Sequence, residues 1–346
     1  MSTNQTEFLS LSLKQAQKDF VLKENDRGFI IAGPAKGKAH GYNYSEIQIP
    51  HRIADRPVFK IADNAFESCD NLQTISIPEG VEEIGDEAFA YCTGLCRINF
   101  PSSLRKIGNA AFEYCTNLNE IEIPKGVTEL GIGLFMGNAN LTSIVVDPEN
   151  PVYDSRGGCN AIIETKTNTL HSGCPTTVIP GDIVALGNRC FADVLLKAIT
   201  IPEGVTEIGE CAFSHYEYNK IRFKSALAKV SLPKSLKTIE KSAFESQKKL
   251  KKLVLPEGLS VIGEGAFSRT GLEQIVIPES ITRLEDYMFT GCEKLMKIYI
   301  PESVTFFGKY LFEIGVMSAK AGVIEGKAGS AAEKYAKKNK ITFVAR

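Results

Sequence analysis

The sequence predicts an α/β repeat solenoid, in which short strands and turns wind repeatedly around one elongated core. The first observation is a series of phenylalanines, most of them 22 or 23 residues apart. A series of prolines from Pro78 to Pro301 keeps nearly the same period. Two residue types that share one period indicate a genuine internal repeat. The phenylalanines are Phe66, Phe89, Phe112, Phe135, Phe191, Phe213, Phe244, Phe267, Phe289 and Phe312.

Two longer gaps in this series indicate insertions. The gap of 56 residues after Phe135 equals two periods plus about ten residues, and the gap of 31 after Phe213 equals one period plus about eight. We therefore expect about eleven coils over residues 47–315, with a hairpin inserted near 147–177. Residues 1–46 are expected to form an N-terminal segment and β-hairpin cap, and residues 316–346 a C-terminal cap with a short helix and a final strand.

One unit shows how the repeat is expected to fold. The alternation in Ile75-Ser76-Ile77 is typical of a short strand with one buried face. Pro78 ends this strand because it offers no amide hydrogen, and Gly80 supplies a turn. Asp86 is expected to cap a helical or 3₁₀ turn that carries Phe89 on its buried side.

A single unit cannot enclose its own apolar side chains, so the units are expected to stack. Stacking places parallel, in-register strands on one face and the phenylalanine-bearing turns on the other. Each buried Phe or Ile contributes about 1.5–3 kcal/mol of transfer free energy. The phenylalanine column is therefore interpreted as structural.

The repeated pattern Ile-x-Ile-Pro-x-x-Val-x-x-Ile-Gly-x-x-Ala-Phe resembles the 23-residue leucine-rich repeat of the BspA-like family. It occurs at residues 75–89, and close variants end at Phe213 and Phe267. The resemblance implies a right-handed leucine-rich-repeat superhelix of the bacterial surface-protein type, capped at both ends. It also implies an extracellular or cell-surface location and binding to host or matrix partners. The first residues show neither a basic start nor an apolar stretch, so no signal peptide is expected and a cytoplasmic location is the alternative.

The ends of the chain carry signals for caps. Phe20–Leu22 and Gly28–Ile31 predict a hairpin over the first coil. Ser330 and Glu333 form a capping-box pattern that predicts a helix through about Lys338, followed by a strand at residues 341–343. Within the central insertion, residues 161–163 and 169–170 predict a second hairpin.

No motif predicts a catalytic, cofactor or metal site. Gly33–Ala39 resembles a phosphate loop but is one residue short and lacks its final Ser or Thr, so a turn is favoured. The four histidines show no metal-ligand spacing. Most of the nine cysteines occupy repeat positions and are interpreted as small core residues. Cys159 and Cys174 are the only pair for which a disulfide is considered, and free thiols are favoured.

Charge provides the one functional indication. Residues 220–252 hold eleven basic and two acidic residues, a net charge of +9, which leaves −10 for the rest of the chain. The simpler interpretation is a solvated face with complementary charges elsewhere. The alternative is a site for an anionic partner, such as an acidic protein surface or a charged glycan. The candidate ligand-binding residues are Lys220, Arg222, Lys229, Lys252 and Lys297.

Composition restricts the function further. A net charge of −1 argues against a general nucleic-acid or membrane-surface binder, and no apolar run reaches the roughly 18 residues that a membrane-spanning helix needs. A non-enzymatic binding or adhesion module is the leading hypothesis, because repeat surfaces are broad and exposed. An intracellular protein-interaction scaffold is the alternative. An enzyme is least expected, because no nucleophile–base pair stands outside the repeat pattern.

Overall fold

The structure of the chain is a computed structural model that describes residues 10–35, 45–216, 224–313, 317 and 322–346. It contains two compact units. Unit 1 comprises residues 1–166 and 172–177, and unit 2 comprises residues 167–171 and 178–346. The division falls within the predicted insertion. The predicted domain boundaries themselves stay predictions, and each unit is described here by itself.

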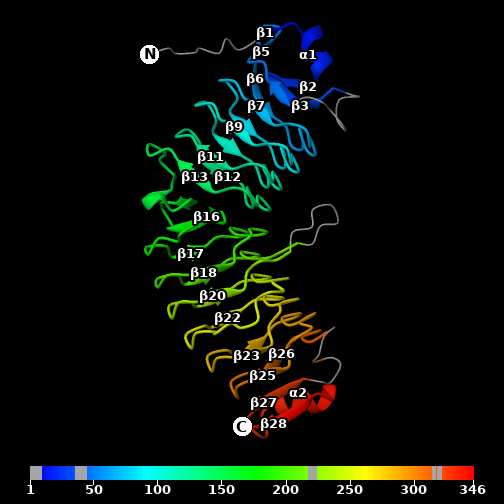
Figure 1. Cartoon of the computed structure of the whole chain (residues 1–346), viewed down its shortest axis with the longest axis vertical. Helices are drawn as coiled ribbons and strands as arrows, with labels where there is room; N and C mark the ends of the chain where they lie inside the picture. Colours follow the sequence, from blue (N-terminus) through cyan, green and yellow to red (C-terminus); the bar gives the residue numbers. More distant parts are fainter. Residues whose placement is uncertain (1–9, 36–44, 217–223, 314–316, 318–321) are drawn as a thin grey trace. The chain divides into compact units, whose positions relative to one another are not determined.

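Unit 1 begins with a cap and continues with repeated coils (Figure 1). Its elements are β1 (Ser10–Leu11), α1 (Leu13–Asp19), β2 (Phe20–Asn25), β3 (Gly28–Pro34), β4 (Glu46–Gln48), β5 (Arg52–Ile53), β6 (Arg56–Ile61), β7 (Thr74–Ser76), β8 (Glu83–Ile84), β9 (Arg97–Asn99), β10 (Lys106–Ile107), β11 (Glu120–Ile123), β12 (Glu129–Leu130), β13 (Ser143–Val146), β14 (Tyr153–Asp154), the 3₁₀ turn η1 (Arg156–Gly158) and β15 (Ala161–Glu164).

Unit 2 continues the repeat and ends in a second cap. Strand β16 (Thr169–Gly173) has its first three residues in unit 2. The following elements are β17 (Ala185–Leu186), β18 (Ala198–Thr200), β19 (Glu207–Ile208), β20 (Lys229–Ser231), β21 (Thr238–Ile239), β22 (Val261–Ile262), β23 (Gln274–Val276), β24 (Arg283–Leu284), β25 (Lys297–Tyr299), β26 (Phe306–Phe307), β27 (Val323–Gly326), α2 (Ala331–Asn339) and β28 (Thr342–Ala345).

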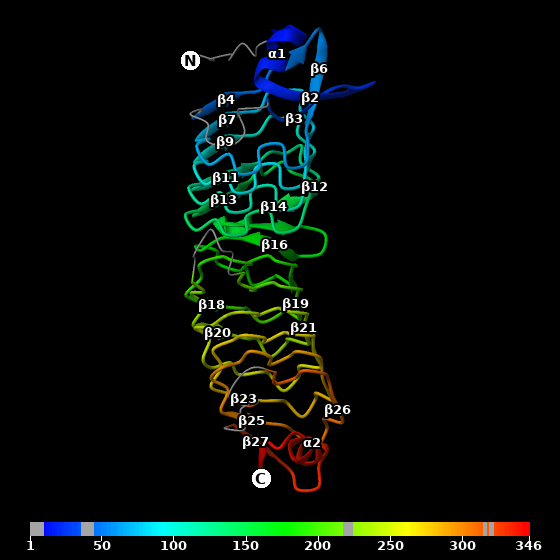
Figure 2. The same ribbon diagram turned by 90° about the vertical axis from the view of Figure 1, so that its right-hand side faces the viewer.

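Two rows of parallel strands run through each unit, on opposite edges of the coils (Figure 2). The first row precedes the proline of each repeat. In unit 1 it contains β4, β7, β9, β11 and β13, and in unit 2 it contains β18, β20, β23, β25 and β27. The second row follows the proline, as in β8, β10 and β12 or in β19, β21 and β22. Pairing is in register at the repeat spacing, for example Ile75 with Ile98 and Ile208 with Ile239. The predicted stack of in-register coils is confirmed, and the handedness of the coil stays a prediction.

The repeated phenylalanines form a stacked column in the core of each unit. All ten side chains are buried, with at most 6% of their surface exposed. Phe89 lies between Phe66 and Phe112, with ring centroids 5.3 and 5.4 Å away and the planes within 3° of parallel. In unit 2, Phe213 stacks in the same way on Phe191 and Phe244. The column is therefore structural, as the sequence predicts.

The phenylalanine-bearing segments are not helical, which corrects the expectation of helical or 3₁₀ turns. Glu87 and Tyr91, two residues before and after Phe89, have positive φ angles of 53° and 60°. This left-handed geometry interrupts a helix. Alternate N–H groups, those of Glu87, Phe89 and Tyr91, donate to carbonyls of the next coil, whereas those of Ala90 and Cys92 donate within the turn. Bonds between coils therefore replace the helical pattern.

Both caps contain the predicted elements. Strands β2 and β3 form the antiparallel hairpin of unit 1, and β3 continues the second row by pairing with β6. In unit 2, the Ser330 side chain accepts the N–H of Glu333 at the start of α2. The capping box differs from the expected one, because the Glu333 carboxylate accepts the N–H of Gly329. Strand β28 then pairs with β27.

The central insertion contains short strands, as expected. Residues 161–163 lie in β15, which pairs antiparallel with β14 in unit 1. Residues 169–170 lie in β16 and pair parallel with β17 in unit 2, which places them in the second row. Among the described residues, no helix has both the length and the apolar composition required to span a lipid bilayer.

Candidate binding surface and pocket

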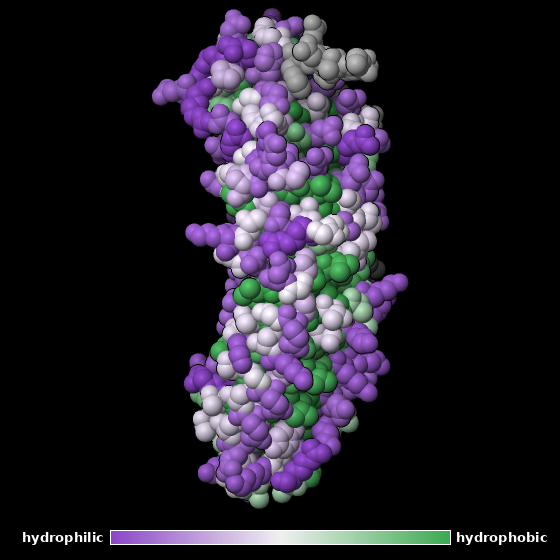
Figure 3. Space-filling model, turned by 90° about the vertical axis from the view of Figure 1, so that its left-hand side faces the viewer, coloured by the Kyte–Doolittle hydropathy of each residue, from purple (hydrophilic) through white to green (hydrophobic). Residues whose placement is uncertain are grey.

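The outward face of the first row in unit 2 combines exposed apolar and basic side chains. Leu253 and Leu255 point into the core, whereas Val254 between them has 84% of its surface exposed. In the next coil, Val276 is 57% exposed between two buried isoleucines. Figure 3, which looks onto one flank of the coils, shows hydrophobic residues at the surface between hydrophilic ones. Solitary exposed apolar residues are common, but a row of them across neighbouring coils is typical of an interaction surface.

The predicted basic residues lie partly on this face. Lys229 begins β20, and Lys252 lies just before the exposed Val254; both are exposed. Lys297 begins β25, but its ammonium group forms a 2.7 Å ion pair with the carboxylate of Glu325, which neutralises its charge. Lys220 and Arg222 fall outside the described residues. The structure therefore brings Lys229 and Lys252 to the same row and places Lys297 further along it, in an ion pair.

Ion pairs between neighbouring coils neutralise many of the other charged side chains. Each pair joins residues about one repeat apart, as in Lys60–Glu83, Lys106–Glu129, Lys241–Glu264 and Lys251–Glu273. Lys229 and Lys252 form no such pair with any residue that the structure describes. Exposed pairs contribute little stability, but they remove charge from the surface. Lys229 and Lys252 therefore keep their positive charge on the outward face.

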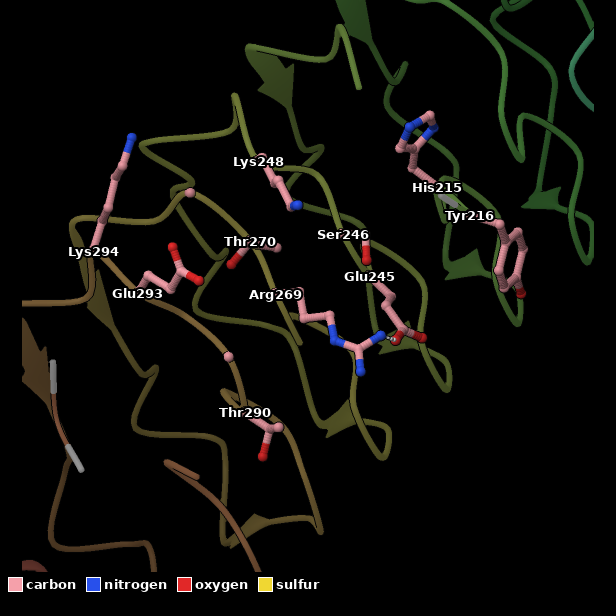
Figure 4. Close-up of a pocket in the computed structure, with 12 residues that line it drawn as sticks. His215, Tyr216, Glu245, Ser246, Lys248, Arg269, Thr270, Thr290, Glu293 and Lys294 are labelled. Carbon is pink, nitrogen blue, oxygen red and sulfur yellow. Dashed lines mark ion pairs between the residues drawn. The ribbon is translucent and has the colours of Figure 1, made fainter. Parts of the chain in front are cut away.

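A pocket of about 680 Å³ opens where the phenylalanine-bearing turns of unit 2 lead toward the first row (Figure 4). Its lining carries three basic side chains, Lys248, Arg269 and Lys294, and two carboxylates, Glu245 and Glu293. Arg269 lies 3.6 Å from Glu245, as marked in Figure 4. The described lining of the pocket is therefore polar and carries charges of both signs.

A buried Asp–His pair supports one end of this pocket. His215 Nδ1 lies 2.8 Å from Asp193 Oδ1, and both side chains are almost fully buried. The same carboxylate oxygen accepts the N–H of Tyr216, also at 2.8 Å. Burial and a hydrogen bond to Cys211 raise the pKa of Tyr216 to about 12, so its hydroxyl is neutral at physiological pH. Asp193 thus fixes the positions of both His215 and Tyr216.

Sequence reasoning missed this pair, although a signal was present. Asp193 and His215 each follow a repeated phenylalanine by two residues, so they occupy one repeat position in neighbouring coils. In-register stacking brings such residues together. The repeat therefore places an acidic side chain directly beside a histidine in the core. A search of the sequence for metal-ligand spacing does not detect such a pair.

Seven of the nine cysteines are buried, in agreement with the interpretation of most of them as small core residues. The thiols of Cys92 and Cys115 donate to the carbonyls of Phe66 and Phe89. Cys69 begins this column and is partly exposed; a hydrogen bond with Cys92 lowers its pKa, whereas burial raises that of Cys92. All nine cysteines are free, including the pair considered for a disulfide, Cys159 and Cys174. Across the described ranges, no three His, Cys, Asp or Glu side chains are placed to hold a metal ion.

The model of the BspA type leucine rich repeat region matches the chain in six copies, over residues 40–155, 171–230 and 223–315. These ranges cover most of the sequence. The chain belongs to this family. Membership in the BspA-type family accounts for the 23-residue period and indicates a protein-binding or adhesion role in general terms. A comparison with curated proteins gives no significant match.

Solved structures show the same fold. The pneumococcal vaccine antigen PcpA is 21% identical, with a TM-score of 0.69 over 100% of this chain and 91% of that one. A leucine-rich cell surface protein from Faecalibacterium prausnitzii A2-165 is also 21% identical, with a TM-score of 0.50 over 84% and 92%. A leucine-rich repeat protein from Eubacterium ventriosum is 17% identical, with a TM-score of 0.51 over 82% and 81%. At these identities, the likeness establishes the BspA-type fold alone.

Proposed function

We propose that this protein is a non-enzymatic binding module that recognises an acidic protein partner through the outward face of the first row in unit 2. The observation that carries the proposal is the combination of Lys229 and Lys252, which lack ion-pair partners among the described residues, with the exposed Val254 and Val276. Apolar side chains contribute burial to an interface, and the charges select and orient the partner.

The location of the protein at the cell surface is part of the proposal. It is supported by the likeness to the Faecalibacterium protein, which is described as a cell surface protein. An intracellular interaction scaffold is the second candidate. Nine free cysteines support it, because free thiols persist more readily in a reducing compartment.

The proposal is tested by a double charge reversal, Lys229→Glu with Lys252→Glu. The matched control reverses Lys14 and Lys18, two exposed lysines of α1 in unit 1, so that net charge changes equally. Wild type and both variants are immobilised and exposed to a matrix preparation and to a host-cell extract, and the retained proteins are compared by mass spectrometry.

We expect an acidic protein that wild type and the α1 control retain and that the Lys229/Lys252 variant loses. Retention on wild type should also fall between 50 and 300 mM salt, because exposed charges are screened. Identical sets of retained proteins on all three baits would contradict the proposal.

A further inference from the structure

Three cysteines of unit 1 form a column beside the phenylalanine stack. Cys69, Cys92 and Cys115 each follow a repeated phenylalanine by three residues, so they occupy one position in successive coils. The Cys92 and Cys115 thiols are fully buried and donate to the carbonyls of Phe66 and Phe89, which accounts for both as structural residues. Cys69 differs from them because it is partly exposed. The column therefore has one end that solvent reaches.

Cys69 and Cys92 are in direct contact. Burial and a hydrogen bond with Cys69 raise the pKa of Cys92, and the same hydrogen bond lowers the pKa of Cys69, as expected when the Cys92 thiol is the donor. At the Phe66–Phe89 stack, equivalent side chains of these two coils lie 5.3 Å apart. Disulfides join cysteines whose Cα atoms are roughly 4.4–6.8 Å apart. A bond between the two sulfurs therefore fits the spacing of the coils.

Cys69 is the more reactive of the two sulfurs. Its partial exposure admits a small polar oxidant, whereas Cys92 is fully buried. The thiolate is the nucleophilic form of cysteine, and the hydrogen bond from Cys92 favours it at Cys69 although burial and the Asp70 carboxylate oppose it. An accessible cysteine of this kind beside a second thiol is the arrangement found in cysteines that react reversibly with oxidants.

We propose that Cys69 and Cys92 form a peroxide-reactive pair, in which hydrogen peroxide oxidises Cys69 and Cys92 converts the product to a disulfide. The Cys69 thiolate attacks one peroxide oxygen, the O–O bond breaks, hydroxide leaves and Cys69 becomes a sulfenic acid. The Cys92 sulfur then attacks the Cys69 sulfur, and the S–O bond breaks. The proton of the Cys92 thiol and the leaving hydroxide form water. The two sulfurs together lose two electrons, which reduce both peroxide oxygens to the level of water.

The disulfide joins the coils of Phe66 and Phe89 covalently and protects Cys69. A sulfenic acid without a neighbouring thiol is oxidised further to products that thiols do not restore, whereas a disulfide is reduced again by an added thiol. The pair lies in unit 1 and the proposed binding face in unit 2. The Lys229/Lys252 variant should therefore form the same disulfide, so the two proposals fail separately.

Two other cysteines show whether contact, exposure or register decides the reaction. Cys96 is also partly exposed, but its thiol donates to the carbonyl of Gln73. Cys115 has the same register with Cys92 as Cys92 has with Cys69, but Cys92 and Cys115 are both fully buried. If exposure alone decided the reaction, Cys69 would link to Cys96. If register alone decided it, Cys92 would also link to Cys115.

The experiment treats the reduced full chain with hydrogen peroxide and maps its disulfides. Remaining thiols are blocked with iodoacetamide, the chain is cut after glutamate, and the peptides are analysed by mass spectrometry. Glu79 and Glu83 lie between the two cysteines, so a disulfide joins two separate peptides, and fragmentation distinguishes Cys92 from Cys96. Cys92→Ala and the matched control Cys96→Ala are treated in the same way, and dimedone is added to a parallel sample to trap sulfenic acid at Cys69.

We expect wild type and Cys96→Ala to form the Cys69–Cys92 disulfide roughly tenfold more abundantly than any other. Cys92→Ala should instead accumulate the dimedone adduct of Cys69. A dominant link to Cys96, a link between Cys92 and Cys115, or wild-type thiols that stay reduced would each overturn the inference. The wild-type map decides these outcomes even if Cys92→Ala fails to fold.

Discussion

The phenylalanine column makes a quantitative prediction at Phe89. This ring is fully buried and stacks on two neighbours at 5.3 and 5.4 Å, with planes within 3°. Phe89→Leu keeps most of the buried volume but removes both aromatic contacts. Each such contact contributes about 0.5–1.5 kcal/mol beyond burial, so the expected loss in the free energy of unfolding is about 1–3 kcal/mol. Phe89→Ala adds a cavity and should cost about 3–5 kcal/mol.

Phe135→Leu is the matched control within unit 1. Its ring stacks on one phenylalanine, Phe112, at 6.2 Å and 25°, so the loss should be about half as large. Urea unfolding is followed by far-ultraviolet circular dichroism, because the chain contains no tryptophan. Equal losses at Phe89 and Phe135, or a Phe89→Leu midpoint equal to that of wild type, would refute the stacking argument. A smaller m-value would mean that coils on either side of the substitution unfold separately.

Three further predictions concern buried polar groups and thiols. Iodoacetamide should label Cys69 before Cys115, and at a lower pH than an ordinary thiol requires, because the lowered pKa of Cys69 increases its thiolate fraction. Peptide mass spectrometry across pH 6–9 measures the order of labelling. Labelling of Cys115 before Cys69 would refute the prediction. His215→Ala should cost about 3–5 kcal/mol because it removes the partner of the buried Asp193 carboxylate, and a thermal midpoint equal to that of wild type would contradict this. Asn138→Cys should stabilise the protein by about 1–3 kcal/mol, because both polar atoms of this buried amide lack hydrogen-bond partners among the described residues. Urea titration measures the change in the free energy of unfolding, and a decrease would contradict the prediction.

The repeat and its core were predictable because they depend on one period. The spacing of Phe66, Phe89 and Phe112 fixes which side chains meet, since stacking brings equivalent positions of adjacent coils into contact. The strand around Ile75 and the cap at Ser330 follow from local rules, namely alternation and side-chain capping.

The geometry around the phenylalanines could not be derived in the same way. Asp86 suggests a helix cap, but its carboxylate accepts the N–H of Asn109 in the next coil. The choice between a helical turn and a pair of left-handed residues depends on hydrogen bonds between coils, which contribute only after stacking. Local propensity alone therefore predicts the wrong turn.

The candidate site was only partly predictable, for electrostatic reasons. The sequence places Lys229, Lys252 and Lys297 on one face, but it does not reveal that Glu325 neutralises Lys297. The pocket depends on residues from separate coils, and none of them carries a recognisable motif. Only the register of the stack brings Asp193 to His215.

A photo-crosslinking amino acid at position 254 tests the proposed binding face most directly. Val254 is 84% exposed and lies beside Lys252, so replacing it should leave the fold intact. After incubation with the matrix preparation and irradiation, we predict one crosslinked protein with an acidic surface, and none when the label is at position 14 of α1. Crosslinking from position 14 but not from position 254 would contradict the account.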